Sequence, residues 1–351
     1  MFADRLRRDA PWRPAMMRTR ANMNADERTT LAKTRPGRAS KKKSPLPMRQ
    51  GVSASRVWLP KVYQPDHRYA KTREWQTILD FFLDRFPFLT EAIVRERMHL
   101  GQIASETGER LGPGSPYQSD IHVFYYREIP DEQKIPFSEK VIFKDDRIIV
   151  VDKPHFVPVT PTGRFIRESL VSRLRHRYQN EEICPIHRLD RDTAGVMLFS
   201  CDAKVRGAYQ SLFQKRLISK SYEAIAPLTE REFPFTHRSH IVSSGDPFFI
   251  MRENSGACAN SETVMDIIEK RGSMARYRLE PVTGRQHQLR VHMMSIGCPI
   301  VNDPYYPHLM PDKSEDYSKP LQLLAKTLRF RDPFTKKNRL FESQLHLQKL
   351  P

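Results

Sequence analysis

The sequence of 351 residues contains no long apolar run. Its longest runs, such as residues 148–151, have the length of a β-strand, whereas a helix that crosses a membrane needs about 20 apolar residues. We therefore expect no membrane segment and no membrane partner. Nor does the N-terminal region contain the apolar core of a secretory signal peptide. Apolar residues still make up 39% of the chain, an ordinary share for a globular protein.

Cysteine is scarce as well. The four cysteines, at positions 184, 201, 258 and 298, are scattered, and no two have the spacing of a zinc site. A disulfide scaffold is not expected in a chain of this size, so we interpret them as buried free thiols in a reducing cytosol. The sequence therefore predicts a cytoplasmic protein that holds no metal.

Acidic residues are in the minority, and the formal net charge is +18. Residues 1–57 contain fifteen Lys and Arg but only four Asp and Glu, so most of this charge lies in an N-terminal tail. The charge indicates a polyanionic partner. Because the tail has no apolar period, we expect it to be disordered. Its role stays open between a solvating extension, an arm that binds nucleic acid, and a transit peptide with unusually many acidic residues.

Structure is expected to begin near Trp58 with a small module over residues 58–132. Residues 73–86 have apolar positions at helical spacing, and Pro87 ends this helix. Thr90 is expected to cap a second helix that ends before Gly101. Residues 102–104 and 118–127 are typical of strands. With its interspersed basic side chains, this order of elements resembles the RNA-binding domain first described in ribosomal small-subunit protein four. The alternative is a plain helical cap on the following domain.

Residues 133–351 are expected to form a second, larger domain. Predicted strands outnumber helices and do not alternate with them, which favours an α+β fold with a largely antiparallel sheet. The expected helices are residues 167–178, a helix capped by Asp202, and residues 284–296. The expected strands are residues 140–143, 147–153, 219–226, 261–269, 275–282 and 321–330, with a short strand near the end.

Residues 187–195 read His-Arg-Leu-Asp-Arg-Asp-Thr-Ala-Gly and lead into the apolar strand 196–200. A carboxylate between two arginines is usually part of a surface ion-pair cluster. Here, however, a polar turn runs directly into a strand, which can hold a reactive side chain rigidly. Asp190 and Asp192 also raise the possibility of glycosidase chemistry. Carboxylates two residues apart in a turn do not predict the separation of about 5–9 Å that this chemistry uses.

The predicted helix at residues 284–296 has two sides. Thr283 and Gln286 have the spacing of a capping box, so the helix is expected to start there. Its core side is formed by Leu289, Met293 and Ile296. The opposite side is expected to present Arg285, Gln288 and His292.

Arg290 lies between the two sides of this helix, where a half-buried guanidinium needs a carboxylate partner. We interpret His287 and His292 as hydrogen-bonding residues, since no third metal ligand is spaced near them.

Four segments of the chain, taken in order, resemble the RluA family of pseudouridine synthases. One is the His-Arg-Leu-Asp segment just described, and the other three are Ile-Ile-Val-Val-Asp-Lys-Pro (148–154), Lys-Ser-Tyr-Glu-Ala (220–224) and Thr-Gly-Arg-Gln-His-Gln-Leu-Arg-Val-His (283–292), the last followed by Gly297 and Asp303. The resemblance covers about residues 140–345. Ala194 stands where the family commonly has serine, and Leu324 where many members have histidine. Residues 231–260 match nothing in this pattern.

The resemblance implies the pseudouridine synthase fold and the isomerisation of uridine in RNA. It implies Asp190 as the catalytic carboxylate, Arg290 as its partner and Tyr222 as a stacking residue that also serves as a base or proton relay. It further implies that Arg188 fills the space left by a flipped nucleotide. His187, Arg285 and His287 complete the expected substrate-binding set.

The expected partner is a folded RNA with unpaired uridines, because the target atom cannot be reached inside a stacked helix. Large-subunit ribosomal RNA is the first candidate and transfer RNA the second. No cofactor, DNA partner or oligomer is expected, and the reaction needs neither redox change nor energy input. The alternative from another class is a non-catalytic RNA-binding protein of ribosome assembly. Such a protein need not keep Asp190, Tyr222 and Arg290 together.

Overall fold

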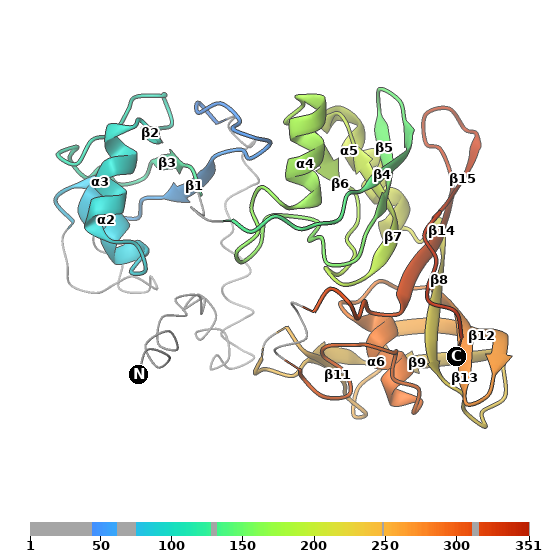
Figure 1. Ribbon diagram of the computed structural model, residues 1–351. Coiled ribbons are helices and arrows are strands. Elements are labelled where there is room, and N and C mark those ends of the chain that lie inside the picture. The colour runs from blue at the N-terminus through green and yellow to red at the C-terminus, as the bar shows by residue number, and fades with distance from the viewer. Residues whose placement is uncertain (1–43, 62–74, 128–131, 248, 311–315, 351) are drawn as a thin grey trace. The chain divides into compact units, whose positions relative to one another are not determined.

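The structure is a computed structural model that describes residues 44–61, 75–127, 132–247, 249–310 and 316–350. The chain divides into two units, residues 1–130 and 131–351, shown in Figure 1. Of the expected tail, residues 1–43 lie outside the described residues. None of the helices within the described stretches is long and apolar enough to cross a membrane.

The described part of the first unit holds two helices beside a three-stranded antiparallel sheet with the order β1-β3-β2. Its elements are β1 (Ser55–Trp58), α2 (Ile78–Arg85), α3 (Glu91–His99), β2 (Ile103–Ser105) and β3 (His122–Tyr125). The predicted cap Thr90 is confirmed, since its hydroxyl accepts a hydrogen bond from the backbone N–H of Ile93. The expected start near Trp58 is too late, because β1 pairs with β3 from Ser55 onward.

The second unit is built on one large sheet with the strand order β4-β5-β7-β14-β8-β13-β12-β9, in which β6 also pairs with β7 and β15 with β14. Every pairing is antiparallel except that of β14 with β7. The expected α+β class with a largely antiparallel mixed sheet is therefore confirmed. Its strands are β4 (Lys140–Lys144), β5 (Ile148–Lys153), β6 (Cys184–Pro185), β7 (Ala194–Ser200), β8 (Ile218–Pro227), β9 (Phe235–Ser239), β12 (Ser261–Arg271), β13 (Met274–Pro281), β14 (Leu323–Arg331) and β15 (Asn338–Glu342).

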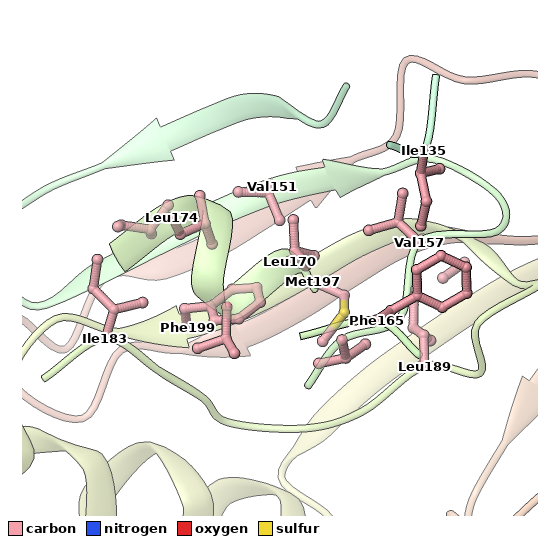
Figure 2. Close-up of a cluster of buried hydrophobic side chains, with 14 of the residues drawn as sticks. Ile135, Val151, Val157, Phe165, Leu170, Leu174, Ile183, Leu189, Met197 and Phe199 are labelled. Carbon is pink, nitrogen blue, oxygen red and sulfur yellow. The ribbon is translucent and has the colours of Figure 1, made fainter. Parts of the chain in front are cut away.

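The helices cover this sheet because its central strands alternate apolar side chains to both faces. On β5, Ile149 and Val151 join the cluster shown in Figure 2, together with Leu170 and Leu174 of α4 (Leu170–Tyr178). The intervening residues of β5 face a second cluster with α5 (Ala203–Gln214), whose predicted cap Asp202 is confirmed. Thus β5 and β7 are buried on both faces and form a rigid base for the loops at their ends.

The third helix of this unit, α6 (Gln288–Ser295), packs on β12 and β13 through the predicted core residues Leu289, Met293 and Ile296. The expected capping box is wrong. The N-cap residue is His287 with φ 53°, and no side chain caps it. Instead, the side-chain oxygen of Gln288 accepts hydrogen bonds from the Thr283 hydroxyl and the Arg285 N–H. A turn over residues 283–287 therefore precedes the helix.

The described part of residues 231–260, which match no family motif, packs in part against this helix. They contain β9 and the small antiparallel hairpin of β10 (Ile241–Ser243) with β11 (Met251–Glu253). Ile241 packs with Val291 of α6 and with Tyr306. The expected second side of α6 is also wrong, because Gln288 and His292 are buried and only Arg285 of that set is exposed.

Candidate active site

One cavity of about 650 Å³ lies at the ends of β7 and β8 and beside the turn before α6. All seven residues that the sequence suggested for the site line it, namely His187, Arg188, Asp190, Tyr222, Arg285, His287 and Arg290. Segments that are up to about 100 residues apart in the sequence therefore meet in one place. The structure thus brings the seven residues together, while the role of each one stays a prediction.

The Asp190 turn is held by buried contacts on either side of the carboxylate. Leu189 is part of the core cluster in Figure 2. Lys153 is fully buried, and its ammonium donates to the carbonyls of Arg191 (2.9 Å), Val157 (2.9 Å) and Pro154 (3.0 Å). These contacts anchor the turn to β5, so the carboxylate has little freedom to move.

Gly195 fixes the end of the same turn where β7 meets β14. Its φ is +115°, and a Cβ there would lie 2.2 Å from the carbonyl oxygen of Ala325. Only glycine allows this approach. In the same strand pair, Ala194 lies opposite Leu324, and both are buried in one cluster. The two departures from the family pattern thus contact each other, and the apolar pair leaves no polar side chain unsatisfied beneath the site.

Arg290 links Asp190 to a second carboxylate. Its Nε and Nη2 donate to the two carboxylate oxygens of Asp303 at 2.8 and 2.5 Å, while its Nη1 lies 3.4 Å from Oδ2 of Asp190. The implied pairing with Asp190 is present, but the tight bidentate partner is Asp303. Arg290 is also 1% exposed rather than half buried. Although burial opposes its charge, the bonds to Asp303 raise the pKa of Arg290.

These neighbours keep Asp190 ionised. Burial alone would raise the pKa of this carboxyl, but His287, Arg290 and Arg188 outweigh burial and lower it. Burial also lowers the pKa of His287, so the permanent positive charge comes from the two guanidinium groups. The side chain of Asp190 remains 19% exposed to the cavity. A charged carboxylate that is both held and accessible can act as a nucleophile or as a base.

His287 reaches toward Asp190 from the other side. Its Nε2 lies 3.9 Å from Oδ1 of Asp190, and its Nδ1 lies 2.9 Å from the hydroxyl of Tyr306. That hydroxyl accepts a hydrogen bond from the N–H of Met251. Its own proton is then directed to Nδ1, which leaves the proton of neutral His287 on Nε2, facing Asp190.

His187 and Arg188 differ in their surroundings. The Nε2 atom of His187 accepts the N–H of Leu198 (3.1 Å), and its ring stacks on Phe213 with centroids 4.7 Å apart. Burial lowers its pKa to about 3, so it is neutral. This geometry favours a role in holding the turn over direct contact with a substrate. Arg188 is exposed at the cavity.

Tyr222 and Lys220 lie on β8. Burial, and to a lesser degree the charge of Asp190, raises the pKa of Tyr222, so its hydroxyl stays protonated at neutral pH. Tyr222 forms part of the packing between two core clusters. Burial lowers the pKa of Lys220 to about 8, and its ammonium donates to the carbonyl of Thr283 at 3.3 Å.

Sequence reasoning assigned no role to Lys220, Tyr306 or Asp303. Lys220 lies within a quoted motif and Asp303 follows one. The sequence therefore drew attention to both residues but could not predict their contacts. The partner of Arg290 depends on how the chain folds back after α6. In the sequence, Asp303 could have been suggested as a partner only because it is a carboxylate that follows Arg290 by 13 residues.

Comparison with known proteins identifies one family. A family model described as RNA pseudouridylate synthase matches residues 147–295. The dual-specificity RNA pseudouridine synthase RluA of Vibrio vulnificus is 33% identical over 217 residues, which cover 56% of this chain and 79% of that protein.

Two further relatives differ in how much of their length is matched. The human pseudouridylate synthase RPUSD2 is 34% identical over 173 residues, which cover 48% of this chain but only 30% of the human protein. The ribosomal large subunit pseudouridine synthase C of Rickettsia typhi is 27% identical over 289 residues, which cover 76% of this chain and 93% of that protein.

Proposed function

Because the chain belongs to the RluA-type family of RNA pseudouridine synthases, we propose that its cavity converts uridines of a structured RNA into pseudouridine, with Asp190 as the catalytic carboxylate. The observation that carries this proposal is the position of Asp190, which lies 3.4 Å from the buried Arg290 and is open to the cavity. Its cationic neighbours lower its pKa and so favour the ionised form. A non-catalytic RNA-binding protein would have no use for a carboxylate kept in this state.

The reaction breaks the bond between the uracil nitrogen and the sugar, turns the base, and joins it again through carbon-5. Three first steps fit the site: attack of Asp190 on the anomeric carbon, attack on the base, and removal of a sugar proton. Each requires the ionised form, which Arg290 and Arg188 favour. We propose that Tyr222, which lines the same cavity, stacks on the uracil and exchanges a proton in the last step.

The uridine has to leave its helix to reach Asp190, and flipping costs a few kcal/mol. Arg188 lies next to Asp190 and is exposed, so it can occupy the vacated space. An unpaired uridine in a loop lowers this cost, which favours a folded RNA as substrate.

We propose large-subunit ribosomal RNA as that substrate, with the action in the cytoplasm. The Rickettsia typhi relative, named for this RNA and covering 76% of the chain, supports the choice. The test is to map pseudouridines in a strain that lacks the protein. We expect a pseudouridine to be lost from large-subunit RNA. If pseudouridine is lost only from transfer RNA, then transfer RNA is the substrate instead. If no pseudouridine is lost from any RNA, the result favours the alternative of a non-catalytic RNA-binding protein of ribosome assembly.

The first unit is proposed to bind RNA, as its resemblance to the domain of ribosomal small-subunit protein four suggests. In α3, Arg95 and Arg97 are accompanied by His99 near the helix end. Deleting residues 1–57 also removes part of β1, so the cleaner truncations start at residues 44 and 132. We expect removal of residues 1–43 to weaken binding mainly at low salt, because a basic arm acts through counterion release.

Removal of residues 1–131 should in addition weaken binding at high salt, because a folded module recognises shape. Affinity for the full RNA is measured against salt concentration for the whole protein and both truncations. Every matched motif lies beyond residue 140, so a small stem-loop should still be modified. If the longer truncation changes neither affinity nor site choice at any salt, the unit is only a structural cap.

We propose that Lys220, which lines the cavity, contacts a phosphate of the RNA and gives RNA binding a pH dependence. Its pKa of about 8 means that it loses its positive charge as pH rises through that value. We expect KM for RNA to rise by about tenfold between pH 7 and 9 through the loss of a charged contact to phosphate. Lys220→Arg should flatten this dependence because a guanidinium stays charged. The exposed Lys204→Met is the control, and an unchanged pH profile in Lys220→Arg would contradict the assignment.

A further inference from the structure

Three side chains that can bind a metal meet beside α6. They are His237 of β9, Glu253 of β11 and His292 of α6, and their ligand atoms all lie within 4.8 Å of one another. His237 Nε2 and Glu253 Oε1 are 2.8 Å apart. The imidazole rings of His237 and His292 have centroids 4.7 Å apart. We propose that these three residues bind one Zn²⁺ ion, a property that goes beyond the proposed function and does not depend on it.

The donor set suits zinc. Two imidazole nitrogens and one carboxylate oxygen are its usual ligands in sites that keep a fourth position for water. Zinc–ligand bonds of about 2.0–2.2 Å in a tetrahedral arrangement place the ligand atoms about 3.3 Å apart. His237 and Glu253 are already closer than this, and the widest separation in the cluster, at most 4.8 Å, has to shrink by about 1.5 Å. A change of this size needs only small side-chain rotations.

The surroundings of His292 orient it as a ligand. Its Nδ1 lies 2.9 Å from the hydroxyl of Thr263, which the side-chain amide of Gln288 also contacts at 2.9 Å. A ring held through one nitrogen presents the other in a fixed direction, which is the usual arrangement of metal-bound histidines. The Thr263 hydroxyl can donate to Nδ1 or accept from it, so it can serve either tautomer.

Without metal, Nε2 of His292 also has partners, since the hydroxyls of Ser261 and Ser239 lie 3.0 and 3.1 Å away. The Ser261 hydroxyl donates to the carbonyl of Ser239, so its oxygen can accept the proton of Nε2. Zinc binding moves that proton to Nδ1 or to solvent. The cluster is therefore stable in both states, and zinc exchanges weak hydrogen bonds for coordination bonds.

The site would join the unmatched segment 231–260 to the helix of the active site. His292 is two residues beyond Arg290. Strand β11 lies beside α6 (Figure 1), and β9 contacts His292 through Ser239 and His237. Packing already exists there through Ile241, Val291 and Tyr306. The spacing of histidines along the sequence could not reveal this site, because His237 and Glu253 come from a segment that lies more than 35 residues before His292.

The test is calorimetric titration of ZnCl₂ into the tag-free full chain after dialysis against a chelator. Cys258 is an exposed thiol, so all variants carry Cys258→Ser. One zinc per chain is expected. His237→Gln and Glu253→Gln should each weaken binding by at least about tenfold. His240→Gln is the matched control, because His240 lies in the same segment outside the cluster, and its affinity should not change.

Melting curves without metal show whether each variant is folded, and zinc should raise the melting temperature of the parent protein but not of His237→Gln. Co²⁺ binding to the parent protein gives a check that needs no variant. A spectrum without thiolate charge-transfer bands is expected from nitrogen and oxygen ligands. Absence of binding in the micromolar range, thiolate bands, or equal affinity in His237→Gln would each overturn the proposal. Because no RNA is used, the outcome is separate from that of the proposed function.

Discussion

Asp190→Asn is expected to fold and bind RNA normally while its rate of pseudouridine formation falls by more than about a thousandfold. The amide cannot act as a nucleophile or base, but its shape is that of the carboxylate. Stability should change by less than about 1 kcal/mol, because Arg290 keeps its bidentate partner Asp303. The measurement is tritium release from RNA that carries labelled carbon-5 in its uridines, together with RNA affinity and a melting curve.

The matched control is Asp202→Asn at the cap of α5, which lies outside the cavity lining. Asparagine caps a helix as well as aspartate does, so both stability and turnover should be unchanged. Residual turnover of Asp190→Asn within tenfold of the wild type would remove Asp190 from the catalytic role.

Arg290→Met is expected to have the second large effect. It should lower the free energy of unfolding by about 3–5 kcal/mol. The side chain of Asp303 has no exposed area and would lose both of its bonds to the guanidinium. Asp190 would at the same time lose its nearest buried cation, so turnover should also fall. Chemical denaturation measures the first effect and tritium release the second.

The two carboxylates can be told apart by adding Asp303→Asn. If Asp303 is the main partner, the double variant should be more stable than the sum of the two single losses predicts. The exposed pair of Arg278 with Asp266 supplies a control, since Arg278→Met should cost only about 0–1 kcal/mol. An unchanged melting temperature in Arg290→Met would show that its buried bonds contribute nothing.

Local signals in the sequence predicted local structure well. The caps Thr90 and Asp202 were correct because an N-cap contact involves residues only two or three positions apart. The apolar runs of β5 and β7 predicted buried strands. The core side of α6 was also correct, since helical spacing alone determines which residues share a face.

Contacts between distant segments could not be predicted in this way. The start of α6 was wrong because the Gln288 side chain binds the preceding turn instead of leaving Gln286 to cap the helix. The exposed second side of α6 was wrong because Gln288 bonds to β12 and His292 contacts both β9 and β12. The bidentate partner of Arg290 required the return of the chain at Asp303. In each case a tertiary contact overrode a local preference, and residues 231–260 gave no signal of where they would pack.

The central claim is that this cavity isomerises uridine in a structured RNA through Asp190. The direct measurement incubates the purified full chain with a large-subunit ribosomal RNA transcript labelled at carbon-5 of uridine. We predict tritium release that stops after a small number of sites, with no added nucleotide, and no release by Asp190→Asn. Tight RNA binding by the wild type with no release from ribosomal or transfer RNA would contradict the claim and favour a binding protein that keeps the fold.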